Sequence, residues 1–226
     1  MRKAVRRAAK EAYSLRWKVL PPDYNRAYIL RANGFDLTVL PSVFHPKWHF
    51  TSLFFARVCE GLLGREQTTV LDIGTGTGLA ALSAARRATR VVATDINPAA
   101  VRCAKINTIT NRMADKIEVY EGDMFAPVQG QTFDLIICNP PYFRGVPHTE
   151  AQLAYLGGPE LERISRMARG AHAYLNRGGK LACVLGDAAD VPAIIRLIEE
   201  FGWVGRVVAR RSVFIEEITV WEFSER

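Results

Sequence analysis

The sequence predicts an α/β fold built on a doubly wound, mostly parallel sheet, and three features of the chain lead to this prediction. From residue 68 onward, short apolar strands alternate with helices, which is the pattern of a parallel sheet covered by helices on both faces. The first of these strands runs into a glycine-rich turn and then a helix, an arrangement that binds ligands in such sheets. Two consecutive strands end the chain without a helix between them, so we expect the last strand to insert antiparallel.

The strands of the sheet share runs of apolar, often β-branched residues that are bounded by turn residues. Seven are expected, at 68–73, 90–94, 116–120, 133–138, 180–185, 204–209 and 217–223. Apolar residues with helical spacing lie between them, and they predict helices at 79–87, 98–110, 159–175 and 191–201. Ahead of the sheet we expect a short strand at 36–40 and helices at 2–18 and 48–63.

With 226 residues, of which 49% are hydrophobic, the chain fits one α/β domain with a short appendage. We divide it into a basic N-terminal extension and lid segment, residues 1–50, and a domain at 51–226. Residues 1–50 hold ten Lys and Arg against three acids, and the remainder is balanced, so the net charge of +7 belongs to this extension. Such a basic extension is typical of a segment that contacts RNA or a ribosome. The alternatives are a solvated helix that adds only solubility and an Arg-rich organellar transit segment.

The rest of the composition is typical of a cytoplasmic protein without a membrane span or a metal. No apolar run approaches the roughly 20 residues needed to cross a bilayer. The four cysteines lack Cys-x-x-Cys spacing and paired histidines, which favours reduced, packed thiols; they are Cys59, Cys103, Cys138 and Cys183.

The first strand of the sheet ends in a loop that we predict to bind a cofactor. Its residues are Asp72, Gly74, Thr75, Gly76 and Gly78. The glycines let the backbone turn sharply and approach a ligand, and the helix behind them presents free N–H groups. Such loops also serve NAD. A carboxylate at the loop entrance, however, suits a cationic amino group and repels a pyrophosphate, which favours S-adenosylmethionine.

Acids also follow the next two strands. Asp95 and Ile96 end the second strand, where a carboxylate can accept hydrogen bonds from both ribose hydroxyls. Asp123 and Met124 follow the third strand, where Asp123 can accept from the amino group of adenine. Because the carboxyl ends of parallel strands meet at one edge of the sheet, we expect these acids to share one site with Asp72.

The fourth strand ends in the tetrad Asn139-Pro140-Pro141-Tyr142, which we predict to hold the acceptor. The prolines fix two φ angles and remove two backbone donors. The oxygens of the Asn139 side chain and the Pro140 carbonyl remain as acceptors for both hydrogens of a planar NH₂ group. Asn139 also adjoins the predicted cofactor site. Tyr142 would stack on the planar substrate, so Asn139, Pro140 and Tyr142 are the predicted catalytic residues.

These motifs, in this order over residues 68–142, resemble the class I S-adenosylmethionine-dependent methyltransferases, which have a Rossmann-like fold. The tetrad resembles that of enzymes that methylate glutamine N5 or adenine N6. Leu156-Gly157-Gly158 ahead of a helix is similar to the HemK-type small methyltransferase domain of release-factor glutamine methyltransferases. The resemblance implies a protein substrate such as a release factor, and an activating subunit is a further expectation. Residues 45–49 depart from the acidic or Thr/Ser-containing motif of those enzymes.

Several functions therefore stay open for this sequence. An N-methyltransferase (EC 2.1.1) acting on a protein glutamine comes first, followed by one acting on adenine N6 in RNA or DNA, where Tyr142 would stack on an extruded base. A small-molecule N-methyltransferase is the third alternative. An NAD-dependent oxidoreductase does not account for Asp72, and a non-enzymatic RNA-binding protein does not account for the tetrad.

Overall fold

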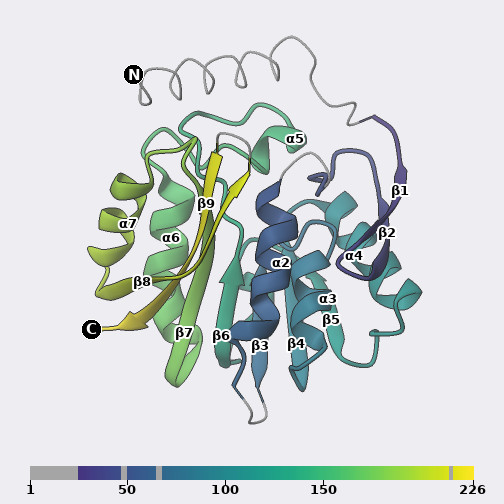
Figure 1. Ribbon diagram of the computed structural model, residues 1–226, viewed down its shortest axis with the longest axis horizontal. Helices are drawn as coiled ribbons and strands as arrows, with labels where there is room; N and C mark the ends of the chain where they lie inside the picture. Colours follow the sequence, from purple (N-terminus) through teal and green to yellow (C-terminus); the bar gives the residue numbers. More distant parts are fainter. Residues whose placement is uncertain (1–24, 47–49, 65–67, 214–215) are drawn as a thin grey trace.

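The computed structural model describes residues 25–46, 50–64, 68–213 and 216–226, and it confirms the α/β fold with a seven-stranded sheet (Figure 1). The strand order is β5-β4-β3-β6-β7-β9-β8. Five of these strands are parallel neighbours, namely β3 (Thr69–Ile73), β4 (Arg90–Asp95), β5 (Ile117–Glu121), β6 (Phe133–Cys138) and β7 (Leu175–Gly186). The helix predicted at 2–18 lies outside the described residues.

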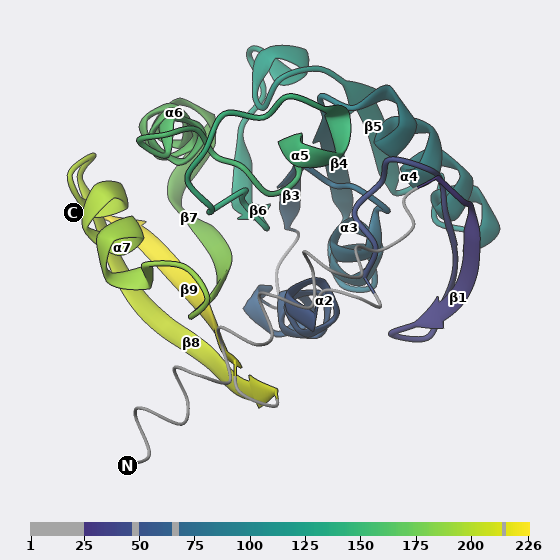
Figure 2. The ribbon, with the colours of Figure 1, turned by 90° about the horizontal axis from the view of Figure 1, so that it is seen from above.

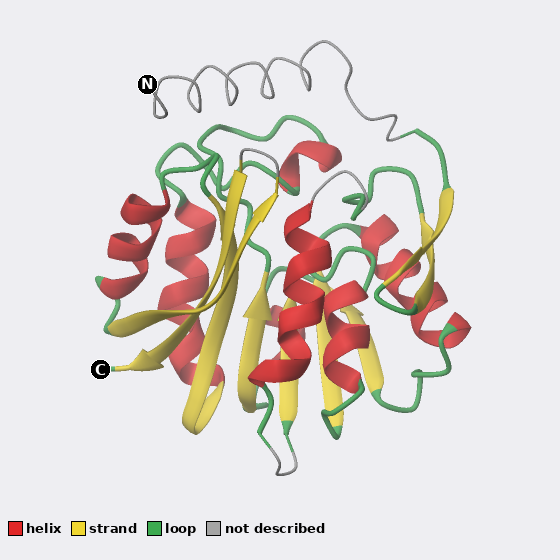
Figure 3. Cartoon of the chain, in the orientation of Figure 1, coloured by secondary structure: helices red, strands yellow, loops and turns green. Residues whose placement is uncertain are grey.

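The last strand inserts antiparallel, as predicted. β9 (Glu216–Glu225) lies between β7 and β8 (Trp203–Val213) and is antiparallel to both (Figure 3). β8 therefore runs in the same direction as the parallel strands and ends at the same edge of the sheet. Because β9 begins there, Glu216 stands beside the carboxyl ends of the parallel strands.

Helices cover both faces of the sheet (Figure 2). One face carries α2 (Phe50–Leu62), α3 (Leu79–Ala85) and α4 (Pro98–Thr110). The other carries α6 (Glu162–Ala171) and α7 (Val191–Glu199). A short α5 (Glu150–Leu153) and two 3₁₀ turns, Ala126–Val128 and His172–Tyr174, were not predicted. Within the described part of the chain, no helix is long and apolar enough to cross a membrane.

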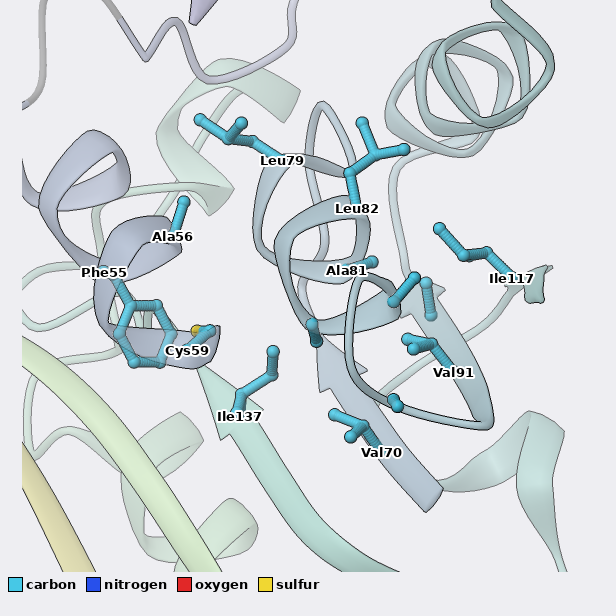
Figure 4. Close-up of a cluster of buried hydrophobic side chains, with 14 of the residues drawn as sticks. Phe55, Ala56, Cys59, Val70, Leu79, Ala81, Leu82, Val91, Ile117 and Ile137 are labelled. Atoms are coloured by element: carbon cyan, nitrogen blue, oxygen red, sulfur yellow. The ribbon is translucent and has the colours of Figure 1, made fainter. Parts of the chain in front are cut away.

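The core under α2 and α3 explains why these helices form where they do. Figure 4 shows Phe55 and Cys59 of α2 on the side of Ile137 of β6, and Leu82 on the side of α3 away from Val70 of β3; all five are at most 1% exposed. Burial of each large apolar side chain contributes roughly 1.5–3 kcal/mol. Desolvation by the same packing raises the pKa of the Cys59 thiol well above its ordinary value. All four cysteines are buried free thiols.

A hairpin that the sequence only half predicted packs against α4. The strand expected at 36–40 is β2 (Phe35–Val39), and it pairs with a second strand, β1 (Tyr28–Ala32). The turn is Asn33-Gly34, with φ of 50° and 81°, which is the signature of a tight hairpin turn. Asn107 of α4 continues the pairing, since it accepts from Thr38 N and donates to Thr38 O at 2.8 Å each. The hairpin is thereby fixed to the sheet domain.

The boundaries near α6 and β7 differ most from the prediction. The predicted helix at 159–175 begins only at Glu162, because Leu161 has the left-handed φ of 61°. The helix ends at Ala171 and the 3₁₀ turn 172–174 follows it, so only Leu175 of the predicted helix belongs to β7, which is much longer than the predicted 180–185. Turn residues Gly157-Gly158-Pro159 keep the chain from continuing a helix there.

Candidate active site

A cavity opens at the carboxyl ends of β3, β4 and β6, where the strand order reverses, which is the position of ligand sites in open α/β sheets. It is lined by the loops that follow β3, β4, β5 and β6, and by parts of α2, α6 and residues 42–44. The structure thus brings together nearly all of the predicted site residues. Those lining the cavity are Asp72, Gly74, Thr75, Gly76, Asp95, Ile96, Asp123, Met124, Asn139 and Pro140.

The glycine loop after β3 has the conformation that its sequence requires. Gly74 and Gly76 have φ of 69° and 56°, and a Cβ on either would meet no atom within 4 Å, so their surfaces face open space. The amides of Gly74 and Thr75 donate to the Thr94 carbonyl, which ties the loop to β4. Gly78 does not line the cavity. A Cβ there would lie 3.3 Å from Ala104, so this glycine lets α3 approach α4.

Asp72 is a buried carboxylate at the bottom of the loop, only 2% exposed. Its Oδ2 accepts a hydrogen bond from the Thr75 hydroxyl at 2.6 Å. Desolvation, together with the nearby charge of Asp95, raises the pKa of Asp72 to about 7, although the Thr75 hydrogen bond acts in the opposite direction. Because ionising a buried carboxyl group is costly, a cationic ligand group beside Asp72 would stabilise its charged form.

Asp95 is held by two backbone amides at the end of β4. Its Oδ2 accepts from Gly76 N at 2.8 Å, and its Oδ1 accepts from Asn97 N at 2.9 Å. Burial raises the pKa of this carboxyl, while these hydrogen bonds and the Arg163 guanidinium act in the opposite direction. Each oxygen keeps a lone pair for a further donor, so the fixed carboxylate can accept from two adjacent hydroxyls.

The third acid, Asp123, is already paired on one side. Its Oδ2 accepts a hydrogen bond from Arg166 Nη2 at 2.6 Å. The neighbouring Met124 has a left-handed φ of 52°, and Ile96 is 42% exposed. Both line the cavity as apolar surfaces between the acids, so this end of the cavity can receive a flat, partly polar ring.

The charges that line the cavity are mostly negative. Among its described lining residues, Asp72, Asp95 and Asp123 are acidic, and Arg163 is basic. S-adenosylmethionine carries a sulfonium and an ammonium group against one carboxylate, a net positive charge. The donor set and its charge therefore fit this cofactor better than they fit a pyrophosphate.

The tetrad leaves β6 at the edge of this cavity. Asn139 Nδ2 donates to the Ser52 hydroxyl of α2 at 3.2 Å, which turns the amide so that its oxygen points away from α2. Pro140 and Pro141 line the cavity, and Tyr142 does not. The half-buried Tyr142 lies with its ring centroid 5.0 Å from that of Phe143 and its hydroxyl near Gly186. Asn139 and the two prolines of the tetrad thus line the cavity, and Tyr142 lies outside that lining.

Sequence reasoning missed the contribution of Ser52, whereas residues 42–44 belong to the segment predicted as a lid. Ser52 lies in the first turn of α2, a few residues after the stretch 45–49. Ser42, Val43 and Phe44 reach the cavity because the hairpin is fixed to α4, and Asn97 Nδ2 donates to Ser42 O at 3.0 Å.

The doubly wound sheet and its cavity together define a transferase that binds a nucleoside-containing cofactor. Comparison with known proteins identifies the family. The profile of the family described as methyltransferase small domain matches residues 50–215, so the chain belongs to this family. Like its HemK-type relatives, it is an S-adenosylmethionine-dependent methyltransferase.

Two relatives show how far the similarity extends. A protein of Methanocaldococcus jannaschii, assigned provisionally as a protein N5-glutamine methyltransferase, is 30% identical over 201 residues, covering 85% of this chain and 96% of the relative. A release factor glutamine methyltransferase of Moorella thermoacetica is 37% identical over 164 residues, covering 67% of this chain. The chain spans only 57% of the length of that second relative.

Solved structures support the fold. A 16S rRNA N2 G1207 methyltransferase of T. thermophilus, in complex with AdoMet and guanosine, matches with a TM-score of 0.66 and 24% identity over 89% of this chain and 50% of that one. The E. cuniculi Mtq2–Trm112 complex, described as methylating the translation termination factor eRF1, matches with a TM-score of 0.57 and 20% identity over 82% of this chain and 99% of that one. At these identities the likeness concerns the fold.

Proposed function

We propose that this methyltransferase modifies the side-chain amide nitrogen of a glutamine in a release-factor-like protein. The main support is the pair of oxygen acceptors offered by Asn139 and Pro140 at the edge of the cofactor cavity. A primary amide donates two hydrogens in one plane, and these two oxygens accept both. The glutamine methyltransferases among the relatives favour this acceptor over the exocyclic amine of adenine.

Each acid at the strand ends has a separate role in holding the cofactor. S-adenosylmethionine supplies an electrophilic methyl group on its sulfonium. Asp72 holds the ammonium group, and Asp95 accepts from the ribose hydroxyls with the lone pairs that Gly76 N and Asn97 N leave. Asp123, with one oxygen fixed by Arg166, accepts from the adenine amino group. Ile96 and Met124 pack against the ring.

The tetrad activates the acceptor by positioning and not by proton removal. Hydrogen bonds to Asn139 Oδ1 and to the Pro140 carbonyl draw the two N–H bonds to one side, which frees the nitrogen lone pair for attack on the methyl carbon. The bond from the methyl group to sulfur would break as its bond to nitrogen forms, leaving a neutral thioether. The extra proton would then pass from nitrogen to water, so no general base is needed beforehand. Most of the rate enhancement then comes from orientation and fixed dipoles. Tyr142 packs on the amide plane.

Other components belong to the same proposal. An activating subunit is consistent with the Mtq2–Trm112 neighbour, whose fold this chain shares. The basic residues 2–18, which lie outside the described residues, are proposed to bring the enzyme to an acceptor on the ribosome. Division of the chain at residue 50 stays a prediction, although the hairpin at 28–39 packs firmly on the domain.

The test is methyl transfer from S-adenosyl-[methyl-¹⁴C]methionine into fractionated cell extract, with the Asn139→Ala protein as the matched control. We expect label in the protein fraction that is released as volatile methylamine on acid hydrolysis, because an N-methyl amide hydrolyses to methylamine and a carboxylate. Nuclease-sensitive label in methyladenosine would replace the glutamine assignment by adenine N6. Label only in small molecules would exclude both macromolecular acceptors.

Replacement of Asp95 by alanine is expected to raise the Kd for S-adenosylmethionine by at least roughly 100-fold, measured by calorimetry. Two hydrogen bonds to a charged acceptor are lost, each contributing about 1.5–3 kcal/mol. Asp95→Asn keeps one acceptor oxygen, so its Kd should lie between those of the unsubstituted protein and Asp95→Ala. An unchanged Kd in Asp95→Ala would rule out the ribose assignment.

Replacement of Ser52 by alanine is expected to lower kcat roughly tenfold while the Kd for the cofactor changes little. The Asn139 amide loses the 3.2 Å hydrogen bond from its Nδ2 to the Ser52 hydroxyl and samples orientations with NH₂ toward the acceptor. Ser52→Thr keeps the hydroxyl and serves as the matched control, with near-normal kcat. A Ser52→Ala enzyme with normal kcat would show that Asn139 is oriented by other contacts.

A further inference from the structure

Glu216 is the first residue of β9, and its backbone is anchored firmly at the active-site edge of the sheet. The next residue, Glu217, donates from its N to Asp187 Oδ1 at 3.0 Å and accepts from Asp187 N at 2.9 Å. Arg210 of β8 holds the Glu217 carboxylate at 3.2 Å. Because β9 is tied in this way to both β7 and β8, the direction in which the half-buried Glu216 side chain leaves the sheet is defined.

The Glu216 carboxylate lies over Gly186, the last residue of β7. A Cβ added at Gly186 would collide with Glu216 Oε1. The φ of Gly186 is outside the left-handed region that favours glycine, so the backbone does not demand this residue. The glycine instead leaves the space that the carboxylate occupies.

The Tyr142 hydroxyl lies at the same point. It is 3.4 Å from where a Cβ of Gly186 would be, so the phenol oxygen and the Glu216 carboxylate meet above one backbone position. This places them close enough for a direct or a water-bridged hydrogen bond. The two side chains come from segments more than seventy residues apart, the tetrad after β6 and the start of β9.

We infer that Glu216 is a positioning residue that accepts a hydrogen bond from the Tyr142 hydroxyl and thereby fixes the tyrosine ring over the acceptor, with Gly186 providing the room. The inference rests on the proposed role of the tetrad in acceptor binding. Tyr142 does not line the cofactor cavity, and its ring is tilted by 54° against that of Phe143. A carboxylate acceptor on its hydroxyl holds the ring in one orientation, since hydrogen bonds to charged groups are among the strong ones.

The first experiment needs no acceptor and is therefore independent of the proposed function. The protein is labelled with [ζ-¹³C]tyrosine, and the Tyr142 signal is assigned by its loss in Tyr142→Phe. A phenol that donates to a carboxylate ionises less readily, so we expect the pKa of Tyr142 to fall in Glu216→Ala and in Gly186→Ala. Glu216→Gln retains an acceptor oxygen but no charge and should give an intermediate value.

Gly186→Ala is the decisive variant, because the added methyl displaces only the far end of a flexible side chain and the fold has no reason to change. An unchanged Tyr142 pKa in both Gly186→Ala and Glu216→Ala would overturn the inference. Circular dichroism and cofactor Kd should match the unsubstituted protein. Glu217→Ala, which removes the neighbouring carboxylate bound to Arg210, is the charge-matched control and should leave the Tyr142 pKa in place.

The second experiment is a double-mutant cycle in the methyl-transfer assay, with whichever acceptor carries label in the extract experiment. Glu216→Ala and Gly186→Ala are each expected to lower kcat/KM about tenfold, mainly through the KM for the acceptor. In a Tyr142→Phe background the same changes should have little further effect, because the group through which they act is gone. Fully additive losses would mean that Glu216 acts on the acceptor without Tyr142. Failure of every acceptor to be labelled would refute the proposed function but not the pKa result.

Discussion

Asn139→Ala is expected to lower kcat by at least about a hundredfold, and up to about a thousandfold, while the Kd for S-adenosylmethionine stays within about threefold. Removal of one fixed hydrogen-bond partner of a developing charge from an active site typically lowers kcat by this factor. In the proposed mechanism Asn139 Oδ1 accepts one of the two hydrogens of the acceptor NH₂, so its removal should leave the nitrogen neither oriented nor activated. Single-turnover methyl transfer and calorimetry of cofactor binding measure the two quantities separately.

The separation of the two effects is what tests the roles assigned to the site. Asn139→Asp keeps an acceptor oxygen in the same place but loses the Nδ2 donor to Ser52, so its kcat should fall less than that of the alanine variant. If the cofactor Kd rose in proportion to the loss of rate, Asn139 would be a cofactor ligand and not an acceptor ligand. Similar kcat losses in Ser52→Ala and Asn139→Ala would mean that orientation of the amide is its whole contribution.

The sheet and the cofactor side of the site could be predicted because each part is encoded locally. Strands buried on both faces read as continuous apolar runs, and the acids that follow them are forced to one edge by the parallel arrangement. The predictions for β3, β4 and β6 were therefore confirmed within about a residue, and Asp72, Asp95 and Asp123 do line one cavity.

The parts that were missed depend on contacts between distant segments. Ser52 reaches Asn139 only because α2 packs across the end of β6, and no pattern within α2 shows this. β1 was missed although the Asn33-Gly34 turn signals a hairpin, since its stability comes from α4. The long β8 and β9 were predicted too short because exposed, charged residues pair at their ends, where apolar patterning gives no signal.

Two of the predicted site residues do not line the cavity, for different physical reasons. Gly78 contacts α4 instead because the third glycine of such a loop provides close helix packing. Tyr142 turns away from the cavity because two prolines fix the chain ahead of it. The sequence motif predicts that both residues belong to the site, but it does not give their directions, which depend on the packing of α4 and of β9.

Asp72→Asn is expected to have opposite effects on cofactor binding and on the stability of the free protein. Asp72 has a pKa of about 7 in the folded protein because burial disfavours its charge, whereas an aspartate in the unfolded chain has a pKa of about 3.9. The folded protein thus binds one more proton than the unfolded chain between these values, and its unfolding free energy declines as pH rises through about 4 to 7. The decline is up to about 4 kcal/mol. Asparagine does not ionise and so removes this decline. At pH 8, chemical denaturation should therefore give a larger unfolding free energy for Asp72→Asn than for the unsubstituted protein.

Cofactor affinity should depend on the protonation of Asp72 in the opposite direction, increasing as the pH rises. The ammonium group of S-adenosylmethionine favours ionised Asp72, so the Kd of the unsubstituted enzyme should be roughly tenfold larger at pH 6 than at pH 8. Asp72→Asn should bind weakly at both pH values and lose this dependence, leaving only the titration of the cofactor's own amine and of Asp95, whose pKa is also raised by burial. A variant that was both more stable and unchanged in cofactor affinity would show that the buried carboxylate does not contact the ammonium group. A variant that lost stability at pH 8 would show that the Thr75 hydrogen bond contributes more than the desolvation of Asp72 costs.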